Sequence, residues 1–196
     1  MTDTAIIILA AGKAARLGRI KPLLLWNNST FIQFTIDTAK AAGVAPVVVI
    51  TGAYAETVTA TLDPSAVDIV FNPNWEQGKS SGVVAGMLHL MAQYPAVQNV
   101  IIAVCDQPYV TSMLLEQLYQ IRQDTQKNMV AAAYEGTVGT PVLFSRKYFE
   151  QLLQLKKEEG AKKLLQTNPD DMATVDFPMG GMDIDTEEEY QRLINS

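Results

Sequence analysis

The sequence predicts a three-layer, Rossmann-like α/β fold with a mostly parallel sheet. Short apolar runs rich in β-branched residues recur along the chain, and longer segments of helical period separate them. Glycine and proline fall at the ends of these segments, where turns are expected. The 196 residues are 48% hydrophobic and contain no repeat or linker, so we expect residues 1–196 to form one domain.

The expected strands are continuous apolar runs without alternation, which is typical of strands buried on both faces. They cover residues 5–9, 46–51, 67–72, 100–104, 129–133 and 173–177. In sheets of this kind, ligands bind beyond the carboxyl ends of the strands. The residues that follow each strand are therefore the first candidates for chemistry.

The expected helices lie between the strands, at residues 30–42, 54–62, 80–94, 111–124, 146–155 and 158–166. A closing helix is expected at residues 186–194. It begins with Thr186, a residue type that caps helices, and three glutamates follow. Their negative charge suits the positive end of a helix, which strengthens the prediction.

Composition excludes several classes of protein. The apolar runs fall short of the roughly 18 to 20 residues that span a bilayer, so no transmembrane helix is expected. With a formal charge of -6 and no basic stripe, long nucleic acid is not an expected partner. Asp3 stands where a secretory signal would carry positive charge, which predicts a cytoplasmic protein.

The single cysteine and the single histidine limit the chemistry further. Cys105 has no internal disulfide partner, and together with His89 it does not make a zinc site, so any metal must be held by oxygen. We expect Cys105 to be a packed small hydrophobe, because nothing near it in sequence would lower its pKa. His89 lies in a helical pattern and is expected to be a packed or surface residue.

The loop after the first strand has the character of a triphosphate cradle. Small residues let backbone N–H groups approach an anion, and two cations follow that neutralise phosphate charge. The candidates are Leu9, Ala10, Ala11, Gly12, Arg16 and Lys21. A Rossmann fingerprint would need glycine at Ala14, and a Walker pattern ending at residues 78–80 would need glycine at Pro73. An ordinary strand-to-helix loop with surface cations remains the alternative.

This segment resembles the opening signature of the MobA-like nucleotidyltransferases. That signature is a strand followed by Leu-Ala-(Ala/Gly)-Gly, then an arginine, a glycine and a lysine ahead of paired leucines, and residues 9–24 contain each element. The chain looks most similar to the molybdenum cofactor cytidylyltransferases, which have alanine at the position of Ala11, where guanylyltransferases tend to have glycine. It departs from the family at Ala14 and Ala15, where a polar residue is common, and at residues 26–28.

A second segment, residues 72–82, is similar to the family's Gly-x-Ser-Ser loop at the nucleotide pocket. The resemblance makes Gly78, Ser80 and Ser81 candidates for nucleotide binding. A serine hydroxyl can read a base edge, but it can also simply cap the helix that follows. Both interpretations stay open for each serine.

A third segment, Asp106-Gln107-Pro108, follows an apolar strand and resembles the family's Asp-Gln-Pro motif. A carboxylate at the carboxyl end of a strand faces the ligand crevice, and magnesium prefers one or two carboxylates plus phosphate oxygens. Asp106 is therefore predicted to be a magnesium ligand, although Asp-x-Pro can also simply start a turn.

The resemblance continues near the carboxyl terminus. It implies that a Gly-x-Pro strand at residues 139–144 and a Gly-Ala-x-x-Leu-Leu helix at residues 160–165 build the acceptor side. It also implies that the turn at residues 183–186 returns a carboxylate to the metal. Asp185 is the favoured second ligand, and Asp183 remains the alternative ligand or a partner of the ligands.

The resemblance implies transfer of CMP from CTP to the phosphate of a molybdopterin-type cofactor, with release of pyrophosphate. Arg16, Lys21 and Asp106 would be catalytic, Asp106 and Asp185 would hold magnesium, and a molybdenum hydroxylase would receive the product. Three alternatives stay open: another phosphorylated acceptor such as a sugar phosphate, an NAD(P)H-dependent reductase on the same scaffold, and a non-catalytic chaperone for the pterin.

Overall fold

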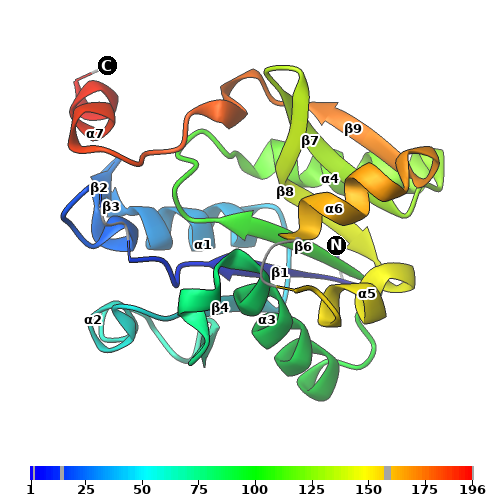
Figure 1. The fold of residues 1–196 in the computed structure, drawn as a ribbon, viewed down its shortest axis with the longest axis horizontal. Helices are drawn as coiled ribbons and strands as arrows, with labels where there is room; N and C mark the ends of the chain where they lie inside the picture. The colour runs from blue at the N-terminus through cyan, green and yellow to red at the C-terminus, as the bar shows by residue number, and fades with distance from the viewer. Residues whose placement is uncertain (2, 14–15, 157–159, 196) are drawn as a thin grey trace.

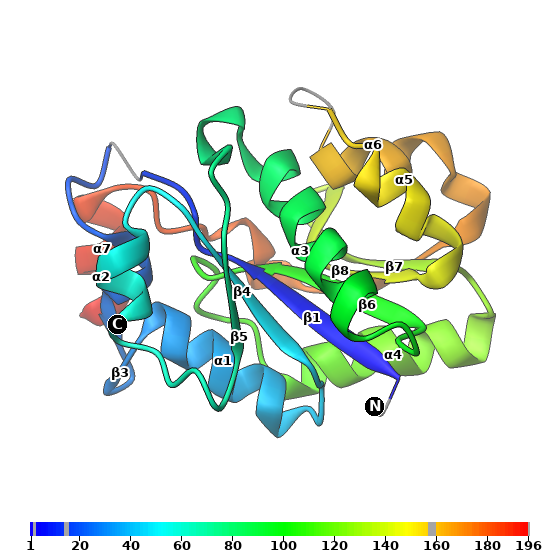
Figure 2. The ribbon, with the colours of Figure 1, turned by 90° about the horizontal axis from the view of Figure 1, so that it is seen from below.

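A seven-stranded sheet forms the centre of the molecule. The computed structural model describes residues 1, 3–13, 16–156 and 160–195. The strands are β1 (Thr4–Leu9), β4 (Val47–Thr51), β5 (Asp68–Phe71), β6 (Asn99–Val104), β7 (Met129–Tyr134), β8 (Thr137–Ser145) and β9 (Met172–Asp176). Their order across the sheet is β5-β4-β1-β6-β8-β7-β9 (Figure 1, with β5 labelled in Figure 2).

The sheet is mostly parallel, as predicted. Strand β1 pairs in parallel with β4 on one side and with β6 on the other, whereas β8 is antiparallel to both of its neighbours. The six strands expected from apolar runs are confirmed, with ends that differ by at most one residue. The pattern of apolar runs did not predict β8, because glycine, threonine and proline interrupt the apolar residues of this strand. Only the family resemblance indicated a strand there.

Helices cover both faces of this sheet and make the three layers (Figure 2). The helices α1 (Phe31–Ala41), α2 (Ala55–Thr59) and α4 (Ser112–Thr125) contribute buried residues to one core cluster. The helices α3 (Lys79–Gln93), α5 (Phe149–Leu153) and α6 (Gly160–Thr167) contribute to a second cluster, on the other face. The two clusters share the sheet, because successive strand residues point to opposite faces.

A small third cluster lies beside the sheet. Helix α7 (Glu187–Ile194) packs there against the hairpin of β2 (Leu25–Trp26) and β3 (Ser29–Thr30), with Leu24, Phe31 and Tyr190 buried between them. The hairpin turn is Asn27-Asn28, and both residues have positive φ, which asparagine tolerates. The departure from the family at residues 26–28 is thus a tight two-residue hairpin.

Some predicted helices are shorter than expected. The helix predicted at residues 54–62 covers only Ala55–Thr59, and the one predicted at 146–155 divides into the 3₁₀ turn η3 (Arg146–Tyr148) and α5. Residues 158 and 159 of the sixth predicted helix lie outside the described residues. Further 3₁₀ turns are η1 (Lys21–Leu23), η2 (Trp75–Gln77), η4 (Pro169–Asp171) and η5 (Pro178–Gly181). No helix within the described ranges has the length and apolar character needed to cross a membrane.

The chain topology opens a crevice beyond the carboxyl ends of β1 and β6. From β1 the chain builds outward through β4 to β5, and it then returns across the sheet to β6. Helices α1 and α3, which start near this end, therefore cover opposite faces. Open α/β sheets bind ligands at such switch points, so this crevice is where a site is expected.

Candidate active site

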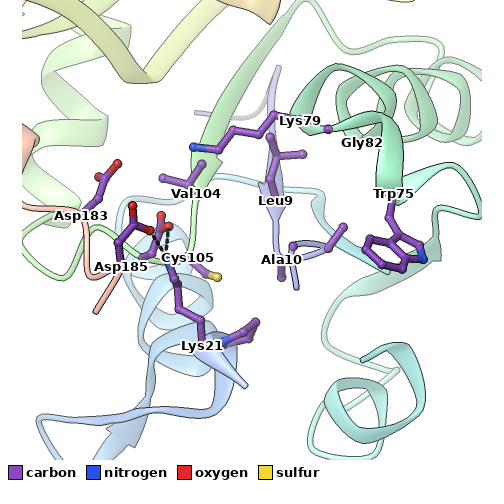
Figure 3. Close-up of a pocket in the computed structure, with 15 residues that line it drawn as sticks. Leu9, Ala10, Lys21, Trp75, Lys79, Gly82, Val104, Cys105, Asp183 and Asp185 are labelled. Atoms are coloured by element: carbon purple, nitrogen blue, oxygen red, sulfur yellow. Dashed lines mark hydrogen bonds and ion pairs between the residues drawn. The ribbon is translucent and has the colours of Figure 1, made fainter. Parts of the chain in front are cut away.

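A cavity of about 330 Å³ occupies this crevice. Its walls come from the ends of β1 and β6, from η1, from the start of α3 and from the segment that precedes α7. The residues that line it are Leu9, Ala10, Ala11, Gly12, Lys21, Pro22, Trp75, Gly78, Lys79, Gly82, Val104, Cys105, Asp106, Asp183 and Asp185. Figure 3 shows most of these side chains in place. Segments distant in sequence thus meet at one end of the sheet.

The loop after β1 forms one wall of the cavity. Its backbone is held against β4, because Ala10 N–H donates to the Ile50 carbonyl (2.9 Å) and Ala53 N–H donates to the Ala11 carbonyl (3.0 Å). A Cβ atom on Gly52 would lie only 2.6 Å from the Ala11 oxygen, so only glycine permits this approach. Residues 9–12, which are predicted to bind nucleotide, all line the cavity. Ala14 and Ala15 lie outside the described residues.

Lys21 joins the two predicted metal-binding carboxylates. Its Nζ donates to Asp106 Oδ2 (2.9 Å) and to Asp185 Oδ1 (2.6 Å). Burial would lower the pKa of Lys21, but the charge of Asp106 and the hydrogen bonds to both carboxylates more than compensate, so its pKa is raised. Arg16, which is exposed at the rim, donates to Asp185 Oδ2 (2.6 Å). Arg16 does not line the cavity itself.

Two carboxylate oxygens in the cavity have no hydrogen-bond partner within the described residues. They are Asp106 Oδ1 and Asp183 Oδ1, and both are buried. Burial, together with the nearby charge of Asp106, raises the pKa of Asp183 to about 6. Unpaired buried oxygens of this kind fit a cation ligand, because a bound cation would compensate the charge that burial disfavours.

These oxygens suit a hard cation that completes its shell with phosphate oxygens and water. Among the described residues, no group of three or more histidine, cysteine or acidic side chains forms a ready metal site. Both oxygens of Asp185 already accept hydrogen bonds from Lys21 and Arg16. In this arrangement Asp183, the alternative ligand, has the free oxygen that Asp185 lacks.

Of the three residues predicted in the loop before α3, the structure places Gly78 at the cavity and the two serines beside it. Gly78 lines the cavity with φ of 88°, a conformation that favours glycine. Neither serine caps α3, since Gly78 is the N-cap and no side chain there accepts a hydrogen bond. The Ser81 hydroxyl instead lies 2.8 Å from the carbonyl oxygens of Asn74 and Gly78 and accepts from Asn72. Ser80 is buried, and neither serine lines the cavity.

Sequence reasoning missed several residues of the cavity, notably Trp75, Lys79 and Gly82. Trp75 lies in η2 beside the loop after β1, and Gly82 faces Leu9 so closely that a Cβ atom there would lie 3.1 Å from its side chain. Lys79 and Gly82 are three residues apart on the first turn of α3, so they share one face. Helical spacing from Gly78 would have found Gly82, which lies four residues further on.

The single cysteine and the single histidine lie outside the group formed by Lys21, Asp106 and Asp185. Cys105 is buried in the core beside the cavity, and burial raises the pKa of its thiol well above the usual range, as expected for a packed residue. His89 lies on α3 away from the cavity, with Nε2 2.6 Å from Asp68 Oδ2.

The predicted acceptor-side helix α6 contacts β8 through Lys162 Nζ and the Thr137 hydroxyl (2.8 Å). These two residues border a separate, open hollow at the β7-β8 hairpin.

The fold and the cavity together define an α/β nucleotidyltransferase. Residues 6–173 match the MobA-like NTP transferase domain, and the chain belongs to that family. The resemblance drawn from the motifs is confirmed, and the protein is a nucleotidyltransferase.

Similar proteins have several names. The chain is 24% identical to the molybdenum cofactor cytidylyltransferase of Escherichia coli, over 97% of this chain and 95% of that protein. It is 26% identical to the nicotine blue oxidoreductase of Paenarthrobacter nicotinovorans, over 96% and 95% of the two chains. The crystal structure of Rv0371c from Mycobacterium tuberculosis superposes with a TM-score of 0.84 at 27% identity, covering 99% of this chain and 98% of that one. A manganese complex of the same mycobacterial protein superposes with a TM-score of 0.77 at 26% identity, covering 99% of each chain.

Proposed function

We propose that this protein transfers CMP from CTP to the terminal phosphate of a molybdopterin-type cofactor, in the cytoplasm and with magnesium. Residues 1–196 would carry this activity as one domain, and a molybdenum hydroxylase would receive the product. The observation that carries the proposal is the group of Lys21, Asp106 and Asp185 at the carboxyl ends of β1 and β6. It combines a cation for phosphate with carboxylates for a metal.

In the proposed reaction, an oxygen of the acceptor phosphate attacks the α-phosphorus of CTP. The bond between that phosphorus and the oxygen bridging to the β-phosphorus breaks, and pyrophosphate departs with the electron pair. The acceptor phosphate is already ionised, so no nucleophile from the protein is needed. Positioning and electrostatic stabilisation supply most of the rate in such transfers.

Lys21 and Arg16 would stabilise the charge that develops on the pyrophosphate. Lys21 is well suited because the two carboxylates hold its ammonium group in one position and keep it protonated. Arg16 lies at the open rim, where the outer phosphates of a triphosphate would extend. Both side chains would exchange some of their carboxylate contacts for phosphate oxygens.

Asp106 would hold the magnesium ion, with Asp185 or Asp183 as the second carboxylate. When bound, magnesium supplies charge neutralisation on the phosphate oxygens. The free oxygens on Asp106 and Asp183 favour this pair as the ligands, with Asp185 orienting Lys21 and Arg16.

Ala11 supports CTP as the nucleotide. Its small side chain lines the cavity and packs against Gly52, which in turn lies next to Trp75. Trp75 offers an aromatic wall to the same cavity, and aromatic rings stack on bases. The loop at Ala11 lies close to Trp75, so the space between them would limit the size of a bound base and favour a pyrimidine.

One experiment tests the proposal most directly: measurement of pyrophosphate release with each nucleoside triphosphate, with and without purified molybdenum cofactor. We expect release with CTP that depends on the cofactor and on magnesium. Release that requires a sugar phosphate instead would move the acceptor to that class. If no triphosphate gives pyrophosphate with any acceptor, the proposal is contradicted.

The similarity to the nicotine blue oxidoreductase favours one second candidate, an NAD(P)H-dependent reductase. A nicotinamide dinucleotide also has phosphates that Arg16 and Lys21 would bind. Oxidation of NADPH, followed by its absorbance with a redox dye as acceptor, distinguishes the two. We expect no oxidation, because the free oxygens of Asp106 and Asp183 serve a metal and have no role in hydride transfer.

A further inference from the structure

Among the described residues, Lys79 is the one cavity-lining cation that the proposed mechanism does not use. It is the first residue of the fifteen-residue helix α3, and its side chain extends into the cavity (Figure 3). Its positive charge is close enough to Asp183 and Asp185 to favour the ionised form of each carboxylate. Within the described residues, its ammonium group forms no hydrogen bond or ion pair.

Lys21 and Lys79 differ in what they can offer a substrate. Lys21 is buried and bonded to two carboxylates, so much of its charge is already compensated. Lys79 is exposed and has no committed partner among the described residues. Its ammonium group can therefore bind an incoming anion without first giving up a hydrogen bond or an ion pair to the protein.

The two lysines also reach the carboxylates from opposite walls. Lys21 comes from η1, on the α1 side, toward Asp185, whereas Lys79 comes from α3 toward Asp183 (Figure 3). In an in-line displacement, the attacking and leaving oxygens lie on opposite sides of the phosphorus. If Lys21 and Arg16 contact the leaving pyrophosphate, then Lys79 lies on the side from which the acceptor phosphate attacks.

The backbone around Lys79 suits an anion as well. Gly78 caps α3 without a side-chain acceptor, so the first N–H groups of the helix are not capped by a side chain. The positive end of the helix dipole adds to the charge of Lys79 at the same place. Gly82, one turn further on, lines the cavity without a side chain that would fill it.

From this placement we infer that Lys79 binds the phosphate of the acceptor and holds it for attack on the nucleotide. The inference rests on the proposed nucleotidyl transfer and specifies its acceptor as a phosphate monoester. Lys79 bonds to a non-attacking oxygen, so that another phosphate oxygen forms the new bond to the α-phosphorus while pyrophosphate leaves. Lys79 itself neither gains nor loses a proton.

The test compares Lys79→Gln with wild-type protein in pyrophosphate release from CTP and molybdenum cofactor. Loss of a charge-assisted hydrogen bond should raise the KM for the cofactor about ten- to a hundredfold. The Kd for CTP alone, followed by the fluorescence of Trp75 in a Trp26→Phe background, should change less than about threefold, which corresponds to about 0.7 kcal/mol. Lys79→Arg, which keeps the charge, should recover most of the affinity for the cofactor.

A matched control is Lys40→Gln, which removes the same charge from an exposed position in the last turn of α1, far from the cavity. If Lys79→Gln behaves like this control, the inference is wrong. It is also wrong if the loss falls on CTP binding while the KM for the cofactor stays unchanged, because Lys79 would then bind the nucleotide. If wild-type protein releases no pyrophosphate in any combination, the proposed transfer itself fails, and this result is distinct from the other two.

Discussion

At the scale of single residues, four charged side chains at the cavity and its rim pair with one another. Lys21 lies between Asp106 and Asp185, and Arg16 closes the group from the rim. The loop after the first strand predicted Arg16 and Lys21, and the strand end predicted Asp106. The family resemblance predicted Asp185. Their mutual pairing was not predictable, because 85 and 164 residues separate Lys21 from its two partners. Only the sheet topology brings them together.

The two cations should respond differently to replacement by alanine. Lys21→Ala leaves two carboxylates close together without their shared cation, which should cost up to about 3 kcal/mol of folding stability. Arg16 is 73% exposed, and its loss should cost less than about 1 kcal/mol. Both variants should lose roughly a hundredfold in turnover if they act on the triphosphate. Urea unfolding beside pyrophosphate release measures both effects.

Arg16→Ala is therefore the better test of the phosphate role, since it separates activity from folding. Near-normal turnover in that variant would show that Arg16 is a surface residue with no role in turnover. The proposed phosphate role in this loop would then rest on Lys21.

Asp106 should be replaceable by asparagine without loss of the fold. Asp106→Asn keeps the shape and removes the charge that would hold magnesium. It should lower turnover by several orders of magnitude, and excess magnesium should not restore it, because the remaining ligands would place the metal poorly. Thermal unfolding measured beside pyrophosphate release separates a dead folded variant from an unfolded one. Wild-type turnover in a folded variant would refute the metal role.

At the scale of elements, the start of α7 fixes the position of Asp185. Thr186 and Glu189 form a capping box, and Glu189 Oε2 accepts from both Thr186 N–H and Asp185 N–H at 2.8 Å. The sequence predicted the threonine cap and the helix, because both depend on residues three or four apart. The additional hydrogen bond to Asp185 N–H, which joins the helix to the cavity, was visible only in the structure.

Glu189→Ala should therefore affect activity as well as stability. Loss of the capping box should cost about 1 kcal/mol, and turnover should fall because Asp185 is less well held. Glu188→Ala is the matched control, since Glu188 is exposed and forms an ion pair with Arg192 on the surface of α7. Equal turnover in the two variants would show that the cap does not position Asp185.

A second cluster joins elements at the far end of the sheet and predicts a pH dependence. The Asp171 carboxylate in η4 accepts hydrogen bonds from Lys147, Asn128 and Tyr148. Burial would raise the pKa of Asp171, but these hydrogen bonds more than compensate and lower its pKa well below the usual range. A lowered pKa means that the carboxylate stabilises the fold above its unfolded pKa of about 3.9 and that this contribution is lost as the pH falls.

Asp171→Asn should thus cost about 1 to 3 kcal/mol at pH 7, as expected for lost hydrogen bonds to a charged group. The cost should shrink below about pH 4, where the wild-type carboxylate begins to lose its advantage. Asp170→Asn is the control, because the Asp170 side chain is exposed and has no partner among the described residues. Chemical unfolding at several pH values measures the difference, and a cost that does not vary with pH would contradict the assignment.

At the scale of the whole molecule, sequence periodicity was enough for the fold class and insufficient for the complete sheet. The buried parallel strands are short, continuous apolar runs, so each can be recognised from its own residues. Strand β8 and the β2-β3 hairpin cannot be recognised in this way, because polar residues occupy or interrupt them and because they form only by pairing with neighbouring strands. The same reason explains Trp75 and Lys79, which become site residues only because β6 returns beside β1 and brings α3 over the loop.

The nucleotide preference is a property of the whole molecule, since ligand binding stabilises the folded state against the unfolded one. A ligand at a hundred times its Kd adds about 2.7 kcal/mol to the free energy of unfolding. For a chain of this length, that gain corresponds to an increase in Tm of roughly 5 to 10 °C. With magnesium present, we expect CTP to raise Tm more than GTP or ATP at equal concentration, because the loop at Ala11 lies close to Gly52 and Trp75 and limits the size of the base. Omitting magnesium and adding a chelator should reduce the shift, which checks that the triphosphate is held as a metal complex. A larger shift with GTP would exclude the cytidylyl preference and leave the assignment to the nucleotidyltransferases unchanged.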